Sequence, residues 1–151
     1  MSSMFSSSTI LYIPKFDSSK ATECASIFNG TKVIKVEEFS ANSLINLNQY
    51  TLVGYSLNSS IRFLLLKGIG TSTYSGSSIR FNYLSNWGVE DETIELSTGA
   101  RQSMIDTLIT YSYDRVANGR DAVTLGLSDK TKALLTEEEI AQITAKGYTI
   151  E

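Results

Sequence analysis

The sequence has no histidine and one cysteine, Cys24, among its 151 residues. Histidine is the commonest general base and metal ligand at neutral pH, so its absence excludes most hydrolytic triads. One cysteine forms no internal disulfide and, without histidine, no zinc site. We therefore expect Cys24 to be a core thiol and expect no catalytic residue, no metal and no cofactor. An enzyme that uses paired carboxylates stays open as a minor alternative, because no pair stands out.

Long apolar runs and a strong excess of one charge are also absent. No stretch approaches the roughly 18 apolar residues that cross a bilayer, and Met1 to Ser8 lacks the basic start of a secretory signal. The net charge of −3 gives no general attraction to nucleic acid or anionic lipid. With 42% apolar and 19% charged residues, the chain is predicted to fold as one domain that neither inserts into membranes nor binds nucleic acid.

What the sequence does contain is an internal repeat. A shift of 23 residues lays the apolar ladder Ile10, Ile13 and Phe16 over Val33, Val36 and Phe39. A third copy follows, but its apolar strand around Ile61 arrives about five residues late, which indicates an insertion. The words Ser60-Ile-Arg-Phe63 recur as Ser78-Ile-Arg-Phe81, and both are predicted to be strands.

Each unit consists of a short helical or turn-like segment such as Ala21 to Phe28, a polar corner, and an extended segment such as Val33 to Val36. Such a unit cannot bury its own apolar face, so stacked neighbours must supply the core. The predicted fold is an α/β repeat, a short leucine-rich-repeat solenoid with one parallel sheet. Repeat units are expected over 1–98, degenerate after 51, and a capping region of the same domain over 99–151.

The first repeat resembles a known family. Met1-Ser-Ser-Met-Phe-Ser-Ser-Ser8, followed by Ile10-x-x-Ile13-Pro14-x-Phe16-Asp17-x-Ser19, is similar to the repeat of BspA-like leucine-rich-repeat proteins. The second copy departs from that pattern at Glu37 and Ser40. The segment from Ile61 to the C-terminus, and Leu134 to Thr149 above all, resembles the closing region of repeat proteins encoded by gut Bacteroidetes and their phages.

The C-terminal third shows helical and strand signals that fit a cap. Gly99 to Ser112 has the apolar stripe of a covering helix, and Ala122 to Leu127 is predicted to be a strand after a turn at Asn118-Gly119. Thr136-Glu-Glu-Glu139 has capping-box spacing for a last helix, which Gly147 would end before a strand at Tyr148 to Ile150.

Three other features are better explained by structure than by chemistry. The acidic run Glu90-Asp91-Glu92 lacks the ligand spacing of a calcium loop and is predicted to be a solvated turn. Gly68-Ile69-Gly70 lacks the rest of a dinucleotide fingerprint and is predicted to turn the backbone. Trp87 is expected in the core.

The candidate binding surface is a column on the outer face of the sheet. Arg62 and Arg80 occupy the same position of the repeated tetrapeptide and are expected to stand in one exposed column beside Tyr12 and Lys35. Arg with Tyr suits recognition of a protein or a surface glycan, whereas a polar edge whose arginine stems cover the sheet is the structural alternative.

The N-terminal end forms a second candidate surface. Met1, Met4 and Phe5 are predicted to form an apolar stacking face, because the chain begins in the middle of a repeat. We expect this face to meet another copy or another virion protein, unless earlier repeats of a longer protein cover it.

The resemblance implies a non-catalytic binding or structural module. The expected role is a phage virion component, in the tail, a fibre or a receptor-contacting part; the alternative is the C-terminal part of a bacterial cell-surface adhesin. Both place the chain on a virion or outside a cell.

Overall fold

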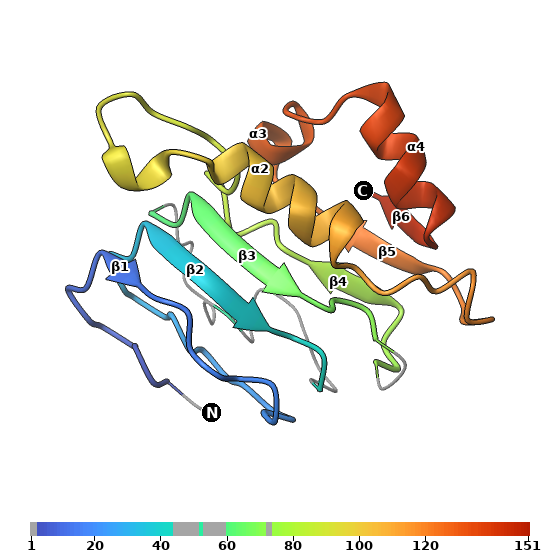
Figure 1. Ribbon diagram of the computed structural model, residues 1–151, viewed down its shortest axis with the longest axis horizontal. Coiled ribbons are helices and arrows are strands. Elements are labelled where there is room, and N and C mark those ends of the chain that lie inside the picture. The colour runs from blue at the N-terminus through green and yellow to red at the C-terminus, as the bar shows by residue number, and fades with distance from the viewer. Residues whose placement is uncertain (1–2, 44–51, 53–59, 72–73) are drawn as a thin grey trace.

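The protein is a small α/β structure with two parallel three-stranded sheets, seen in a computed structural model that describes residues 3–43, 52, 60–71 and 74–151 (Figure 1). The first sheet has the order β1-β2-β3 and the second β4-β5-β6. The strands are β1 (Tyr12–Ile13), β2 (Lys35–Ser40), β3 (Phe63–Lys67), β4 (Ser78–Arg80), β5 (Val123–Gly126) and β6 (Tyr148–Ile150). The helices are the 3-10 turn η1 (Glu95–Ser97), α2 (Ala100–Ile105), the π-helix η2 (Asp106–Thr110), α3 (Asp129–Lys132) and α4 (Glu137–Ala145).

The 23-residue repeat sets the register of the first two strands. Tyr12 pairs with Lys35 and Ile13 with Val36, both 23 positions apart, and Ile13 and Val36 are buried. Before the strands, alternate amides of Ser3 to Ser7 donate to carbonyls of Ala25 to Asn29, so the two turn segments also lie side by side. The segment Ala21 to Phe28 is turn-like and not helical.

Two pairs of repeat-equivalent phenylalanines fill the space between these coils. Phe5 stacks on Phe28 with ring centroids 6.0 Å apart, and Phe16 lies 5.6 Å from Phe39. Phe5 to Phe16 and Phe28 to Phe39 are edge contacts that close the group of four rings. Identical positions in successive repeats therefore pack on each other.

The third strand follows with the insertion that the sequence indicates. Lys35 pairs with Phe63, 28 residues later, which is the 23-residue period plus five. A register shift between Val36 and Phe39 marks an irregularity in β2. Beyond β3, α2 and η2 lie along the strand, as Figure 1 shows, and take the place of a neighbouring strand.

The expectation of one continuous sheet is wrong. β4 pairs in parallel with β5, and β5 with β6, so residues 78–80 belong to a second sheet made mostly from the C-terminal third. The repeated tetrapeptide accordingly splits: Ile61 and Ile79 are both buried, but only Phe63 of the first copy enters a strand, while Ser78–Arg80 form β4. The two identical tetrapeptides pair differently because strand pairing depends on which neighbouring strands are available and not on the tetrapeptide itself.

The C-terminal third follows the sequence signals closely. Thr136 caps α4 with a complete capping box that includes Glu139, and Gly147 turns left-handed at φ 97° before β6. The expected helix over Gly99 to Ser112 is α2 plus η2, begun by Gly99 at φ 80°. Gly99 lies against the Phe63 ring, so a larger residue there would be both strained and crowded.

One continuous apolar core joins both sheets. Trp87 is fully buried, as expected, with its ring 5.2 Å from that of Phe81 and its indole N–H donating to the Leu64 carbonyl. From β6, the buried Tyr148 hydroxyl donates to the carbonyls of Ile69 and Tyr113. In the described part of the chain, no helix combines the length and apolar character needed to cross a membrane.

Candidate functional site

A cation held between two aromatic rings marks the outer face of the first sheet. The register brings together Tyr12, Lys35 and Phe63, here called the aromatic-cation row, on three neighbouring strands. The Lys35 ammonium lies 4.4 Å from the Phe63 ring centroid and 5.8 Å from that of Tyr12. Cation–π contacts of this kind hold the ammonium in place while the face stays open to solvent.

The tyrosine at the sheet edge is fixed by an acidic neighbour. Its hydroxyl donates to the Glu37 carboxylate, and this hydrogen bond, with burial and the Glu37 charge adding to it, raises the pKa of Tyr12. The phenol therefore stays neutral across the physiological range. Its ring, 40% exposed as a residue, is presented in one orientation.

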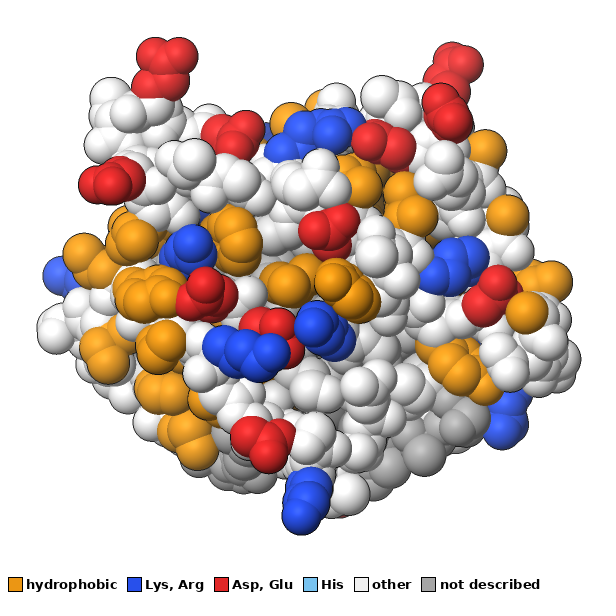
Figure 2. Space-filling model, viewed as in Figure 1, with side chains coloured by type: hydrophobic (Ala, Val, Ile, Leu, Met, Phe, Trp, Pro, Cys, Tyr) orange, Lys and Arg blue, Asp and Glu red, His pale blue; other side chains and the backbone are white. Residues whose placement is uncertain are grey.

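A second set of charges continues along the same face. Glu38 lies 3.1 Å from the Lys15 ammonium and 3.2 Å from that of Lys67, and Lys67 lies 4.7 Å from the centroid of the Tyr111 ring. Burial alone would raise the pKa of Glu38, but the two lysines outweigh it and lower the pKa. Figure 2 shows the resulting surface over β1 to β3, where hydrophobic, basic and acidic side chains alternate.

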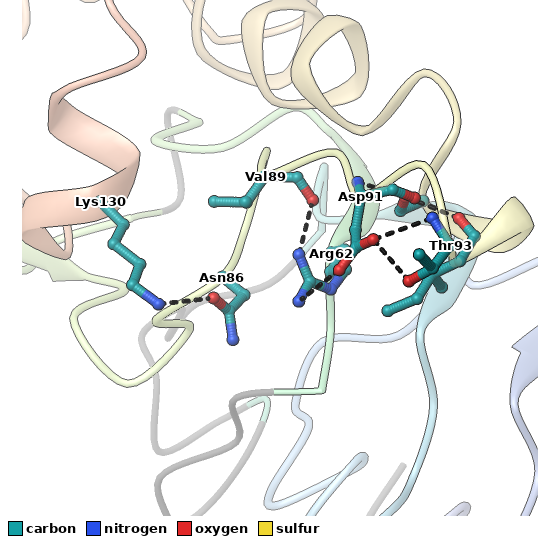
Figure 3. A network of polar contacts seen from close by, with 8 residues as sticks. Arg62, Asn86, Val89, Asp91, Thr93 and Lys130 are labelled. Atoms are coloured by element: carbon teal, nitrogen blue, oxygen red, sulfur yellow. Dashed lines mark hydrogen bonds and ion pairs between the residues drawn. The ribbon is translucent and has the colours of Figure 1, made fainter.

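Arg62 does not belong to the aromatic-cation row, although the tetrapeptide predicted it there. The partner of Lys35 is Phe63, and Arg62 turns instead toward the loop after β4 (Figure 3). Its guanidinium donates to the Val89 carbonyl at 3.1 Å and lies 4.0 Å from the Asp91 carboxylate. Arg62 thus fastens this loop to the start of β3.

The loop that Arg62 holds is ordered by short local contacts. Asp91 accepts hydrogen bonds from the backbone and the hydroxyl of Thr93, and these bonds lower the pKa of its carboxyl. Lys130 reaches the same loop at Asn86. The acidic run is therefore a turn, and no group of three or more metal-ligating side chains occurs among the described residues.

Arg80 lies apart from the other three predicted residues. It is on β4, in the second sheet, so the expectation of one column through Arg62 and Arg80 is wrong. The reason is the break between the sheets: β4 pairs with β5 and not with β3. Tyr12 and Lys35 are brought together as predicted, Phe63 completes their row, and Arg80 occupies a separate surface.

The predicted N-terminal stacking face is changed in composition. Met1 lies outside the described residues, Met4 is 53% exposed, and Phe5 packs inward against Phe16 and Phe28. The other large apolar residues exposed in the first coil are Ile10, Leu11 and Tyr12, at 44%, 48% and 40%. Ile10 differs from the buried Val33 because β1 is the outer strand of its sheet and β2 the central one.

Sequence reasoning missed Phe63, although a signal for it existed. The late arrival of the third strand by five residues places Phe63, and not Arg62, over Lys35. Leu11 was also missed. It lies in a run of four successive apolar residues, Ile10 to Ile13, whereas a strand with one buried face needs an apolar residue only at every second position.

The potential nucleophile is enclosed. Cys24 is only 8% exposed, and burial raises the pKa of its thiol, so the reactive thiolate is disfavoured. This fits the core thiol that the repeat position predicts.

No protein-family model matches the chain, and neither a curated protein nor a solved structure matches it.

Proposed function

We propose that the chain is a non-catalytic binding module, built as a short BspA-like leucine-rich-repeat solenoid and capped by residues 99–151. The 23-residue pairing of β1 with β2 supports the solenoid, as do the phenylalanines that pack on their own repeat equivalents. A cap is supported by α2 and η2, which lie where the next strand would otherwise pair with β3.

The aromatic-cation row is the observation that carries the binding role. A sheet face with ordered aromatic rings suits a protein partner, because aromatic residues are enriched at protein interfaces and Tyr is frequent among the residues that dominate their energetics. The Lys35 ammonium adds a positioned charge to this face. The row needs little reorganisation on binding, since Phe63 and Tyr12 already flank Lys35 and Glu37 already holds Tyr12.

The biological setting follows from the family resemblance. The module serves in a phage virion, in the tail, a fibre or a receptor-contacting part, and a bacterial surface adhesin is the second candidate. Mass spectrometry of purified virions of a phage that encodes the chain separates the two: its presence supports the virion role, and its absence contradicts it.

Contact with another copy or another virion protein is assigned to the N-terminal coil. Met4, Ile10 and Leu11 supply its apolar surface. Light scattering at micromolar concentration, alone and with the neighbouring virion proteins, should detect association. A particle that stays monomeric in every mixture contradicts this part of the proposal.

The binding role is tested with purified proteins encoded by the genes that flank this one. Biolayer interferometry should show at least one saturable partner, and Lys35→Glu should weaken it by about tenfold or more. The matched control is Lys20→Glu, which makes the same charge change on an exposed lysine outside the row. If Lys35→Glu does not weaken binding, the aromatic-cation row is not the binding surface. If both variants lose affinity equally, the loss comes from the change in net charge and not from this surface.

The absence of catalysis is tested separately. Incubation with host-derived glycans should release no new reducing ends. Turnover that scales with protein concentration would overturn the non-catalytic proposal.

A further inference from the structure

A groove crosses the outer face of the second sheet, distant in topology from the aromatic-cation row. It consists of two adjoining hollows of about 640 and 490 Å³, the size range of small-molecule sites. Arg80 and Glu151 line both hollows. We call this the β4–β6 groove; its other main lining residues are Ser78, Asn82, Tyr83, Thr124, Asp129 and Thr149.

The arginine at its centre is uncommitted. Arg80 is exposed and makes no ion pair within the described parts of the chain. Its counterpart in the repeated tetrapeptide, Arg62, has a side chain only 17% exposed and is occupied by Val89 and Asp91. The same tetrapeptide thus gives one arginine that holds a loop in place and one that lines two open hollows.

The floor under Arg80 is shaped by a glycine. A β-carbon on Gly126 would stand 3.3 Å from the Arg80 side chain and 2.6 Å from the Asn82 amide oxygen. Both side chains therefore lie close over this backbone. The Asn82 amide nitrogen donates to the Leu127 carbonyl at 3.2 Å, which fixes the orientation of the amide.

The remaining walls are polar but not uniformly charged. Hydroxyl groups of Ser78, Thr124 and Thr149 lie along the sheet, and the Tyr83 ring closes one side. Asp129 pairs with Lys132 at 3.0 Å, which leaves that couple nearly neutral. Glu151 adds a negative charge.

This chemistry selects among ligands. A guanidinium with free donors favours a carboxylate, which it binds through two parallel hydrogen bonds. The Glu151 carboxylate opposes a polyanion such as nucleic acid. Hydroxyl, amide and carboxylate groups around one aromatic ring suit the hydroxyls and ring face of a sugar, and too little apolar surface is present for a lipid.

We propose that the β4–β6 groove binds an acidic sugar residue of a glycan, a hexuronate or a sialic-acid type, with its carboxylate on Arg80. The sugar hydroxyls are received by Asn82 and the neighbouring hydroxyl side chains. This site is separate from the aromatic-cation row, so either can fail without the other.

The test is titration of the full chain with glucuronate, galacturonate and N-acetylneuraminate, followed by ¹⁵N–¹H NMR. Saturable shifts should include the amides of Arg80, Asn82 and Thr149 for at least one acidic sugar. Glucose, galactose and inorganic phosphate serve as comparison ligands and should bind at least about tenfold more weakly, because they lack either the carboxylate or the ring hydroxyls.

Variants distinguish the site from general charge effects. Arg80→Ala should weaken the acidic sugar about tenfold or more, Arg80→Lys should restore part of that loss, and Lys130→Ala, an exposed cation outside the groove, should change nothing. Thermal melts of Arg80→Ala should match the parent, because the side chain is exposed. Equal binding of neutral sugars, equal binding of phosphate, no shift with any acidic sugar, or no effect of Arg80→Ala would each overturn the proposal.

Discussion

The hydroxyl of Thr107 accepts the backbone N–H of Leu66 at 2.9 Å, so a helix side chain stands where the carbonyl of a fourth strand would stand. One turn earlier, Ser103 accepts from the N–H of Leu64 at 3.3 Å. Both hydroxyls are anchored in turn, donating to the carbonyls of Ser103 and Ala100. Side-chain hydroxyls therefore supply the hydrogen-bond acceptors for these backbone N–H groups on the free edge of β3.

Removal of the Thr107 hydroxyl should be costly. Thr107→Val keeps the shape but leaves the buried Leu66 N–H without this acceptor, which we expect to lower the free energy of unfolding by about 1–3 kcal/mol. Urea denaturation measures the change. The control Thr110→Val, at an exposed site of the same π-helix, should stay within about 0.5 kcal/mol of the parent. Equal stability of both variants would mean that water satisfies the β3 edge.

The central coil should be more sensitive to truncation than the outer one. Phe39 is fully buried, whereas its repeat equivalent Phe16 is only partly buried. We expect Phe39→Ala to lower the free energy of unfolding by about 3–5 kcal/mol and Phe16→Ala by distinctly less. Chemical denaturation of the two variants compares identical chemistry at equivalent positions. A larger loss at Phe16 would contradict the packing described for the four rings.

The contact between Arg101 and Glu139 predicts a pH-dependent share of stability. Burial would raise the pKa of Glu139, but the Thr136 N–H and the Arg101 guanidinium both donate to its carboxylate and lower the pKa overall. A carboxyl with a lowered folded pKa stabilises the fold above its unfolded pKa of about 4.3, and this share disappears as the pH falls through the folded value.

The measurement compares the parent with Glu139→Gln from pH 7 to pH 3. Near neutral pH the free energy of unfolding of the parent should exceed that of Glu139→Gln by a constant amount. This difference in free energy should narrow below about pH 5. Glu138→Gln is the control, because Glu138 is exposed in the same helical turn. If the stability difference between the parent and Glu139→Gln does not change with pH, the charge of Glu139 does not contribute to stability.

The buried thiol gives a probe of global opening. Cys24 should react with a disulfide reagent at pH 8 at least about a hundredfold more slowly in the folded chain than in urea, because burial both blocks access and raises the pKa of the thiol. Absorbance of the released thiolate follows the reaction. A folded chain that reacts as fast as the unfolded one would place Cys24 at the surface.

Features set by local chemistry could be predicted from the sequence. The capping box at Thr136 and the left-handed Gly147 depend on neighbours within four residues, and both are found where they were expected. The pairing of Tyr12 with Lys35 could be predicted because a 23-residue period lines up residues on adjacent strands.

Features set by distant partners could not. Arg62 and Arg80 share one tetrapeptide, yet Arg62 contacts a loop some 27–29 residues later, while Arg80 lies on a strand paired with Val123–Gly126. Nothing within the tetrapeptide encodes that difference. The β4–β6 groove was missed for the same reason, because strands far apart in the sequence form its floor.

The Ser103 and Thr107 hydroxyls make the two edges of the first sheet unequal. On the β3 side, an incoming chain would have to displace two satisfied hydrogen bonds, whereas the β1 side carries no such obstruction among the described residues. The β1 edge, beside Tyr12, is therefore the edge of this sheet on which a further strand adds at the lower cost.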